Sequence, residues 1–138
     1  MENNIIIYRD SILPISETFV KEQSESFEYF HPYFVGSKRV ANGLNLPLGK
    51  VVVNSNTNNA RTKIIERLYK KLGHSPGLLK KMKKINPLLI HAHFGPDGVF
   101  ALPYALKMNV PLLVTFHGYD ATVKDEALIQ QSFNAKHY

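Results

Sequence analysis

The sequence predicts an α/β domain of the Rossmann-like type, in which helices cover a mostly parallel β-sheet. Two short apolar runs rich in strand-forming residues, Pro87–Ile90 and Val110–Phe116, flank one segment of helical length. That succession is typical of a β-α-β unit with both strands buried in a parallel sheet. Each run is followed by histidine and then glycine. Because ligands of open α/β sheets bind at the carboxyl ends of the strands, polar residues at these positions are the first candidates for a functional site.

Length and composition are those of one globular domain. The chain has 138 residues, of which 44% are hydrophobic and 11% aromatic, enough for a real core. It contains no cysteine, so it has neither a disulfide framework nor a thiolate metal site, and we expect it to reside in the cytoplasm. The first residues do not resemble a signal peptide, and no apolar run approaches the roughly 20 residues of a membrane-spanning helix.

The first part of the chain predicts two strands separated by a helix. Ile5–Tyr8 is a short buried strand in this interpretation, and Tyr33–Val35 is a second one. Between them, apolar residues recur at helical spacing over Glu17–Phe27. Ser16 is placed to cap this helix, and the helix dipole would stabilise Glu17 in its first turn.

The remainder predicts further helices and strands. Residues 38–59 are the hardest to interpret, with short extended pieces expected at Leu44–Leu48 and Val51–Val53. Ala60–Leu72 has the apolar spacing of a helix, and a second basic helix is expected to follow it. A last helix is expected from Lys124 to about Ser132. Because a doubly wound sheet ordinarily continues with another strand, we expect the sequence to be part of a longer protein.

The positive charge is concentrated in one region. The formal net charge is +6, and nine of the 17 basic residues lie between Arg61 and Lys84, where Glu66 is the one acid. Such a patch suits an anionic membrane surface or a phosphate-rich ligand, and a solvated charged face is the alternative. Nucleic acid is disfavoured because Tyr69 is the only aromatic residue in the region, whereas stacking platforms need more. The side chains expected to face a membrane are Arg61, Lys63, Arg67, Lys70, Lys71, Lys80, Lys81 and Lys84.

His91 and His93 form a His-x-His pair on one face of a strand, because strand side chains alternate with period two. Such a pair can bind zinc, with His117 or Asp120 as a third ligand. Alternatively, one histidine is packed and hydrogen-bonded while the other lines a pocket. We expect no metal, because the pair alone is a weak motif and a metallohydrolase barrel would need a longer chain.

The run His117–Asp120 places an imidazole, a permissive glycine and a carboxylate at the end of the last strand. A neutral imidazole can exchange hydrogen bonds with a sugar hydroxyl or a phosphate oxygen, and glycine lets a ligand approach the backbone. An ordinary turn capped by Asp120 is the alternative. At the other strand end, Gly95 precedes a helix whose free N–H groups can hold an anion, although Asp97 in its first turn opposes one.

Three motifs together resemble bacterial glycosyltransferase family 4. In chain order they are Leu-Pro-Ile-Ser-Glu-Thr-Phe-Val at 13–20, His-Ala-His-Phe-Gly-Pro-Asp-Gly at 91–98 and Val-Thr-Phe-His-Gly-Tyr-Asp at 114–120. The resemblance runs from about Ile5 to the end of the sequence, and it points to the branch that builds exopolysaccharide, capsule and colanic-acid-type polymers. Three motifs in order are far more specific than any one of them.

The resemblance implies the GT-B architecture, with two Rossmann-like domains facing a cleft and residues 1–138 as an incomplete N-terminal, acceptor-side domain. It implies transfer of a sugar from a nucleotide-sugar donor to a saccharide or lipid-linked acceptor, with retention of anomeric configuration and without a metal or other cofactor. The acceptor suggests that the basic helices contact the inner face of the cell membrane. The family's nucleotide-binding domain, with its Glu-x7-Glu pair, is absent from the sequence. Because the leaving diphosphate needs electrostatic stabilisation, we predict that the isolated chain has little or no transferase activity.

The resemblance also implies which residues act. The catalytic residue would be His117, which faces the transferred sugar in relatives. The loop after the first strand borders donor phosphate or acceptor in relatives, but Pro14–Ser16 stands where many have a glycine pair, so we expect no direct cradling of phosphate there. The implied substrate-binding residues are Ser16, Glu17, Thr18, His93, Gly95, Gly118 and Asp120.

Two other functions stay open. The chain could be a non-catalytic domain that recognises a saccharide or a phosphate without transferring anything. It could also be a metal-dependent hydrolase built on the His-x-His pair, which would require stoichiometric zinc in the purified protein.

Overall fold

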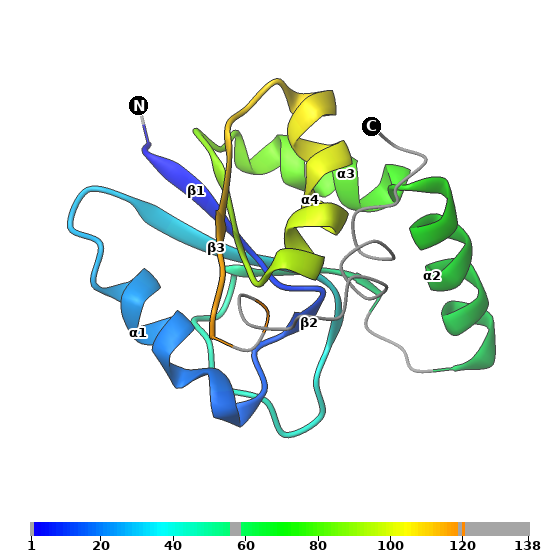
Figure 1. Cartoon of the computed structure of the whole chain (residues 1–138), viewed down its shortest axis with the longest axis horizontal. Helices are drawn as coiled ribbons and strands as arrows, with labels where there is room; N and C mark the ends of the chain where they lie inside the picture. Colours follow the sequence, from blue (N-terminus) through cyan, green and yellow to red (C-terminus); the bar gives the residue numbers. More distant parts are fainter. Residues whose placement is uncertain (1, 56–58, 119, 121–138) are drawn as a thin grey trace.

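The structure is a computed structural model of the chain, and it describes residues 2–55, 59–118 and 120. In this part of the chain, six strands form one sheet whose pairings are all parallel, and helices pack against it (Figure 1). The predicted α/β class with a mostly parallel sheet is therefore confirmed, and the arrangement is compatible with a Rossmann-like fold.

The elements follow the order β1 (Asn4–Tyr8), β2 (Ser11–Ile12), a short 3-10 turn η1 (Ile15–Glu17), α1 (Thr18–Glu25), β3 (His31–Arg39), β4 (Val51–Ser55), α2 (Ala60–Leu72), α3 (Pro76–Ile85), β5 (Ile90–His93), α4 (Gly95–Met108) and β6 (Leu112–Thr115). The predicted strand at Ile5–Tyr8, the predicted helix at Ala60–Leu72 and the predicted β-α-β unit are confirmed. The helix expected from Lys124 lies outside the described residues.

The strand order reverses between β1 and β5. Phe34 of β3 pairs with Ile7 of β1 and also with Val51 of β4, so β1 and β4 lie on opposite edges of β3. The long strands therefore run β4-β3-β1-β5-β6 across the sheet. The short β2 pairs with the last part of β3, on the same side of β3 as β1. The chain builds outward from β1 to β4 and then returns to β5 on the other side of β1. Such a reversal is where open α/β sheets place their ligand crevice, at the carboxyl ends of the strands.

Two apolar cores lie on opposite faces of the sheet. In β1, Ile6 and Tyr8 belong to one core while Ile5 and Ile7 belong to the other, as the alternation of strand side chains requires. The first core is completed by buried residues of α3 and α4, and the second by Val20 of α1 and by the segment before β4. A strand that is apolar on both faces therefore marks the centre of the molecule.

The sequence of α3 explains where this helix begins and ends. Ser75 caps its start, because the Ser75 hydroxyl accepts a hydrogen bond from the backbone N–H of Leu78 at 3.3 Å, and Pro76 occupies the first turn. Asn86 ends it in the left-handed conformation, with φ of 51°. Its apolar side chains are buried while its lysines remain exposed. No helix in the described part of the chain is both long enough and apolar enough to cross a membrane.

Two local predictions were wrong, and one predicted strand is longer than expected. Ser16 does not cap α1: the cap is Glu17, without a side-chain hydrogen bond to the helix, because η1 precedes it and the Glu17 carboxylate points to Arg9. The predicted strand at Tyr33–Val35 is present, but it is the middle of the longer β3. Leu44–Leu48 forms no strand, and Leu46 instead packs into the second core.

Candidate functional site

The candidate site lies at the carboxyl ends of β1, β5 and β6. Arg9 directly follows β1, His93 ends β5, and His117 lies two residues beyond the end of β6. Neighbouring parallel strands bring these three positions to one edge of the sheet, close to where the strand order reverses. The structure thus brings together residues that are far apart in the sequence.

Arg9 is the centre of a buried charge cluster. Its Nε donates to Glu17 Oε2 at 2.8 Å and its Nη2 to Glu17 Oε1 at 2.5 Å. Its Nη1 forms an ion pair with the Asp97 carboxylate and donates to the carbonyl oxygen of His93 at 3.2 Å. The side chains of Arg9, Glu17 and Asp97 are only 15%, 11% and 7% exposed. One guanidinium therefore joins the loop after β1, the start of α1 and the first turn of α4.

The cluster shifts the protonation of its members. Burial raises the pKa of Asp97 to about 7, although the charge of Arg9 opposes this shift. Burial also works to lower the pKa of Arg9, but the carboxylates of Glu17 and Asp97 outweigh it, so that this pKa is raised. Glu17 makes both hydrogen bonds of a bidentate pair with Arg9 and is itself buried. The Glu17 carboxylate therefore binds Arg9, whereas the sequence predicted that it would contact substrate.

Sequence reasoning missed Arg9. The signal was present, because Arg9 follows a buried strand and the rule that favoured the histidines applies equally to it. Gly36 of β3 helps to fix its position: a Cβ at Gly36 would lie 2.0 Å from the carbonyl oxygen of Arg9. Only glycine allows the two backbones to approach so closely.

Three imidazoles lie against one another beside this cluster. His93 Nδ1 is 3.0 Å from His117 Nε2, and His91 Nε2 is 2.8 Å from Thr115 Oγ1. The ring centroid of His93 is 4.2 Å from that of His91 and 5.2 Å from that of His117. Burial, together with the neighbouring histidines and Arg9, lowers the pKa of His93 to about 3. Burial also lowers the pKa of His91. His93 is therefore a neutral, packed histidine at neutral pH, whereas His117 is partly exposed.

Asp120 ties the loop after β6 to the start of α4. Its Oδ1 accepts from the backbone N–H of His117 at 2.6 Å, and its Oδ2 accepts from that of Gly95 at 2.7 Å. The N-terminus of α4, which the sequence suggested as an anion site, thus already has Asp120 on its first amide and Asp97 in its first turn. Gly95 packs under Phe116, whose Cε1 would lie 2.8 Å from a Cβ at this position. A ligand would have to displace Asp120 to reach the Gly95 amide.

Aromatic side chains surround His117. The His117 ring centroid is 4.9 Å from that of Phe19 in α1 and 4.7 Å from that of Phe94. Phe94 also lies under the Arg9 guanidinium, at 4.4 Å from its ring centroid. Ser16 and Thr18, predicted as substrate contacts, are exposed. From this segment it is Phe19 that reaches the imidazole. Gly118 has φ of +46°, so the predicted permissive turn is present, and no described atom lies within 4 Å of a Cβ built there.

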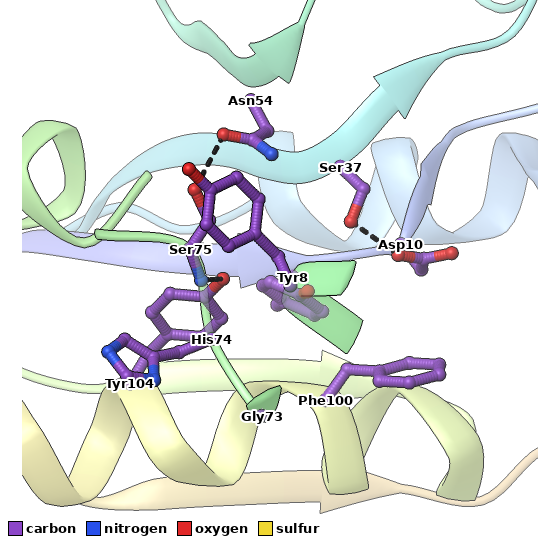
Figure 2. A pocket seen from close by; sticks show the side chains of 10 residues that line it. Tyr8, Asp10, Ser37, Asn54, Gly73, His74, Ser75, Phe100 and Tyr104 are labelled. Atoms are coloured by element: carbon purple, nitrogen blue, oxygen red, sulfur yellow. Dashed lines mark hydrogen bonds between the residues drawn. The ribbon is translucent and has the colours of Figure 1, made fainter. Parts of the chain in front are cut away.

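A second polar pocket lies at the same edge, over β1, β3 and β4 (Figure 2). Ser37 donates to Asp10 Oδ1 at 2.6 Å, and Ser75 donates to Asn54 Oδ1 at 2.8 Å. The Tyr104 hydroxyl accepts from the backbone N–H of Ser75 at 2.8 Å. The space open to water inside the pocket is about 20 Å³, room for roughly one water molecule. Asp10 follows β1, whereas the other residues lie within strands or belong to helices, and none of them was predicted. The pocket is too small for a sugar ring.

The basic region has a different character. The predicted membrane-facing side chains of α2 and α3 are exposed where they are described, and the side chain of Lys70 lies outside the described part. Lys81 is exposed as well, although its Nζ donates to the carbonyl oxygen of Val53 at 2.7 Å. The apolar residues Ile64, Leu68 and Leu72 of α2 are also exposed, by 65%, 52% and 58%. Apolar and cationic side chains are thus presented together on α2.

Among residues 2–55, 59–118 and 120, no group of three or more histidines or acids is arranged to hold a metal ion. The absence of a metal cofactor stays a prediction. No protein-family model matches the chain, and no curated protein matches it.

Proposed function

We propose that the chain is the N-terminal, acceptor-side part of a retaining glycosyltransferase of the GT-B type. The observation that carries the proposal is the grouping of His117, Gly118 and Asp120 with His93 and Gly95 at the strand-order reversal. These residues come from two of the three motifs that resemble glycosyltransferase family 4. The third motif contributes Glu17 to the Arg9 cluster and Phe19 to the surroundings of His117.

The chemistry of this edge suits a sugar bound to a diphosphate. The partly exposed imidazole of His117 can hydrogen-bond a hydroxyl or phosphate oxygen, and the neighbouring Gly118 is exposed. The rings of Phe19 and Phe94 offer apolar faces to the C–H groups of a sugar. Arg9 is already matched by two carboxylates, so its charge is not available for the leaving diphosphate. Stabilisation of that group would then come chiefly from a second domain, as the GT-B architecture provides.

We also propose that α2 and α3 contact an anionic membrane surface, where a lipid-linked acceptor would reside. Exposed lysines and arginines beside Ile64, Leu68 and Leu72 give both the electrostatic and the apolar component of interfacial binding. Such a contact predicts that the protein binds vesicles containing an anionic lipid and is released from them by salt.

The direct test of the function is a transfer assay. The complete reading frame that encodes this chain is expressed and supplied with nucleotide sugars and a polyprenyl-phosphate-linked or oligosaccharide acceptor. We expect transfer with retained configuration, at least a hundredfold slower in His117→Ala than in the wild type. His74→Ala is the matched control, because His74 is also partly exposed but lies in the second pocket, and it should retain activity. Robust turnover by the 138-residue chain alone would contradict the assignment to an acceptor-side half.

A non-catalytic saccharide- or phosphate-binding domain is the second candidate. One observation favours it: the carboxylates of Glu17, Asp97 and Asp120 at this edge are all engaged, with Arg9 or with backbone amides. None of these three carboxylates is therefore a ready general base. Binding of a nucleotide sugar or saccharide without any transfer by the protein from the complete reading frame would favour this candidate.

A further inference from the structure

His93 has hydrogen-bonding requirements that only one proton arrangement satisfies well. It is fully buried, with 0% exposure, and its Nδ1 lies 3.0 Å from Nε2 of His117. Its other nitrogen, Nε2, is buried and has no hydrogen-bond partner in the described part of the chain. A neutral imidazole carries one proton, so the position of that proton on His93 determines what the His117 ring can do.

Two arrangements place a proton between the rings. In the first, His93 Nδ1–H donates to Nε2 of His117, and His93 Nε2 is an unpaired lone pair. In the second, His117 Nε2–H donates to His93 Nδ1, and neutral His93 must then carry its own proton on the unpaired Nε2. The second arrangement buries an N–H group without an acceptor, which proteins rarely do.

Neutral His93 has one proton to place. Burial, together with the neighbouring histidines and Arg9, lowers the pKa of His93, so at neutral pH the ring is not an imidazolium that could donate from both nitrogens. The Arg9 guanidinium holds the backbone of this strand end by donating to the carbonyl oxygen of His93 at 3.2 Å.

We propose that His93 is a positioning residue that donates a hydrogen bond from Nδ1 to Nε2 of His117 and thereby keeps the His117 proton on Nδ1. His117 then presents an N–H donor to the site, while its one lone pair is already engaged. It cannot act as a general base in this state. The ligand atom that meets it must be an acceptor, a hydroxyl or phosphate oxygen. The ligand part of this inference rests on the proposed function, whereas the proton arrangement does not.

The arrangement can be measured in the chain as it is. Long-range proton–nitrogen correlation spectra of ¹⁵N-labelled protein at pH 7.5 distinguish protonated from unprotonated imidazole nitrogens. We expect Nδ1 to be protonated in both His93 and His117, and Nε2 to be unprotonated in both. A protonated Nε2 on His117 would overturn the proposal, and this result does not depend on any variant folding.

Two variants separate donation from packing. His93→Asn retains an amide N–H near the place of Nδ1, and it should retain the Nδ1–H form of His117. His93→Phe keeps a ring but has no donor, so His117 should change to the Nε2–H form that free histidine prefers in water.

Binding of UDP-glucose and GDP-mannose tests the ligand part, with the same substitutions made in the protein from the complete reading frame. We expect affinity about tenfold lower in His93→Phe than in His93→Asn, the size of one lost hydrogen bond. If neither nucleotide sugar binds the wild type, the proposed function is contradicted while the tautomer spectra still decide the role of His93. If His93→Phe leaves the His117 tautomer unchanged, the positioning role is wrong even where both sugars bind.

Discussion

Two polar regions of this molecule differ in how their charges are buried and paired. At the carboxyl edge of the sheet, Arg9, Glu17 and Asp97 are almost entirely removed from water and matched to one another. On α3, Lys80, Lys83 and Lys84 are exposed, and none of them has an ion-pair partner among the described residues. At the edge of the sheet, the loss of any one charged partner should therefore lower the stability of the fold. On α3, salt and external anions should change mainly what the helix binds.

Replacement of Arg9 should have the largest effect. Arg9→Met leaves the Glu17 carboxylate buried without its counter-ion, and we expect the free energy of unfolding to fall by about 3–5 kcal/mol. Urea unfolding followed by circular dichroism measures this change. Lys21→Met is the matched control, because Lys21 and Glu25 form a partly exposed ion pair of α1 at 3.7 Å, and it should cost less than about 1 kcal/mol. Equal losses in the two variants would remove the distinction between buried and exposed charges.

The pH dependence of stability should sharpen the comparison further. Folding raises the pKa of Asp97 from 3.8 to about 7, so its contribution to stability is present below pH 3.8 and is lost as pH rises towards 7. Folding lowers the pKa of His93 from 6.5 to about 3, so its contribution is present above pH 6.5 and is lost as pH falls towards 3. Between pH 3.8 and 6.5 the two slopes oppose each other and largely cancel.

In Asp97→Asn, the free energy of unfolding should show the pH dependence that is due to His93 alone. Asparagine does not titrate, so the variant lacks the contribution of Asp97 that is lost as pH rises. Its free energy of unfolding should therefore rise with pH between 3.8 and 6.5, by at most about 1.4 kcal/mol per pH unit. The wild type should show a much flatter profile over the same range. Urea unfolding in a series of buffers provides the measurement, and parallel profiles for the two proteins would show that Asp97 does not titrate as described.

The fold was largely predictable from the sequence because its signals are local. The isoleucines of β1 and the apolar spacing of α2 specify strand and helix without reference to the rest of the chain. The site was predictable only in part. Strand ends identified His93, His117 and Asp120, but the partners of a buried charge depend on which strands become neighbours.

The errors follow from that limit. Ser16 has good capping chemistry, yet tertiary pairing of Glu17 with Arg9 determined how α1 begins. Ion pairing across 88 positions, as between Arg9 and Asp97, leaves no periodic signal in the sequence. Leu46 is apolar in an extended-looking segment, but it is buried by a loop against the second core and not by strand pairing.

Loss of Asp120 should have an intermediate effect. Asp120→Ala leaves the backbone N–H groups of His117 and Gly95 without their acceptor, and we expect the free energy of unfolding to fall by about 1–3 kcal/mol. Ser26→Ala removes an exposed hydrogen bond to the carbonyl oxygen of Gln23 and should change it by less than about 0.5 kcal/mol. Thermal unfolding of both variants gives the comparison, and an unchanged Asp120→Ala would mean that this carboxylate does not fix the His117 turn.

Substitutions on the basic helix should have the smallest effect on stability and a clear effect on binding. Lys80→Gln with Lys84→Gln should leave the free energy of unfolding within about 0.5 kcal/mol of the wild type. Binding to phosphatidylglycerol vesicles should weaken by about 1 kcal/mol for each lysine removed. Lys107→Gln, which changes an exposed lysine of α4, is the control. Unchanged flotation with vesicles would favour a merely solvated face.

The central claim is that the carboxyl edge at β1, β5 and β6 binds part of a nucleotide sugar or its acceptor. Titration of the ¹⁵N-labelled chain with UDP-glucose, GDP-mannose and an oligosaccharide or polyprenyl-phosphate acceptor, followed by backbone amide shifts, tests it most directly. The account predicts saturable shifts at Gly95, His117 and Gly118, largely absent in His117→Ala, with α3 unaffected. Shifts confined to α2 and α3, or no shifts with any of these ligands at millimolar concentration, would contradict it.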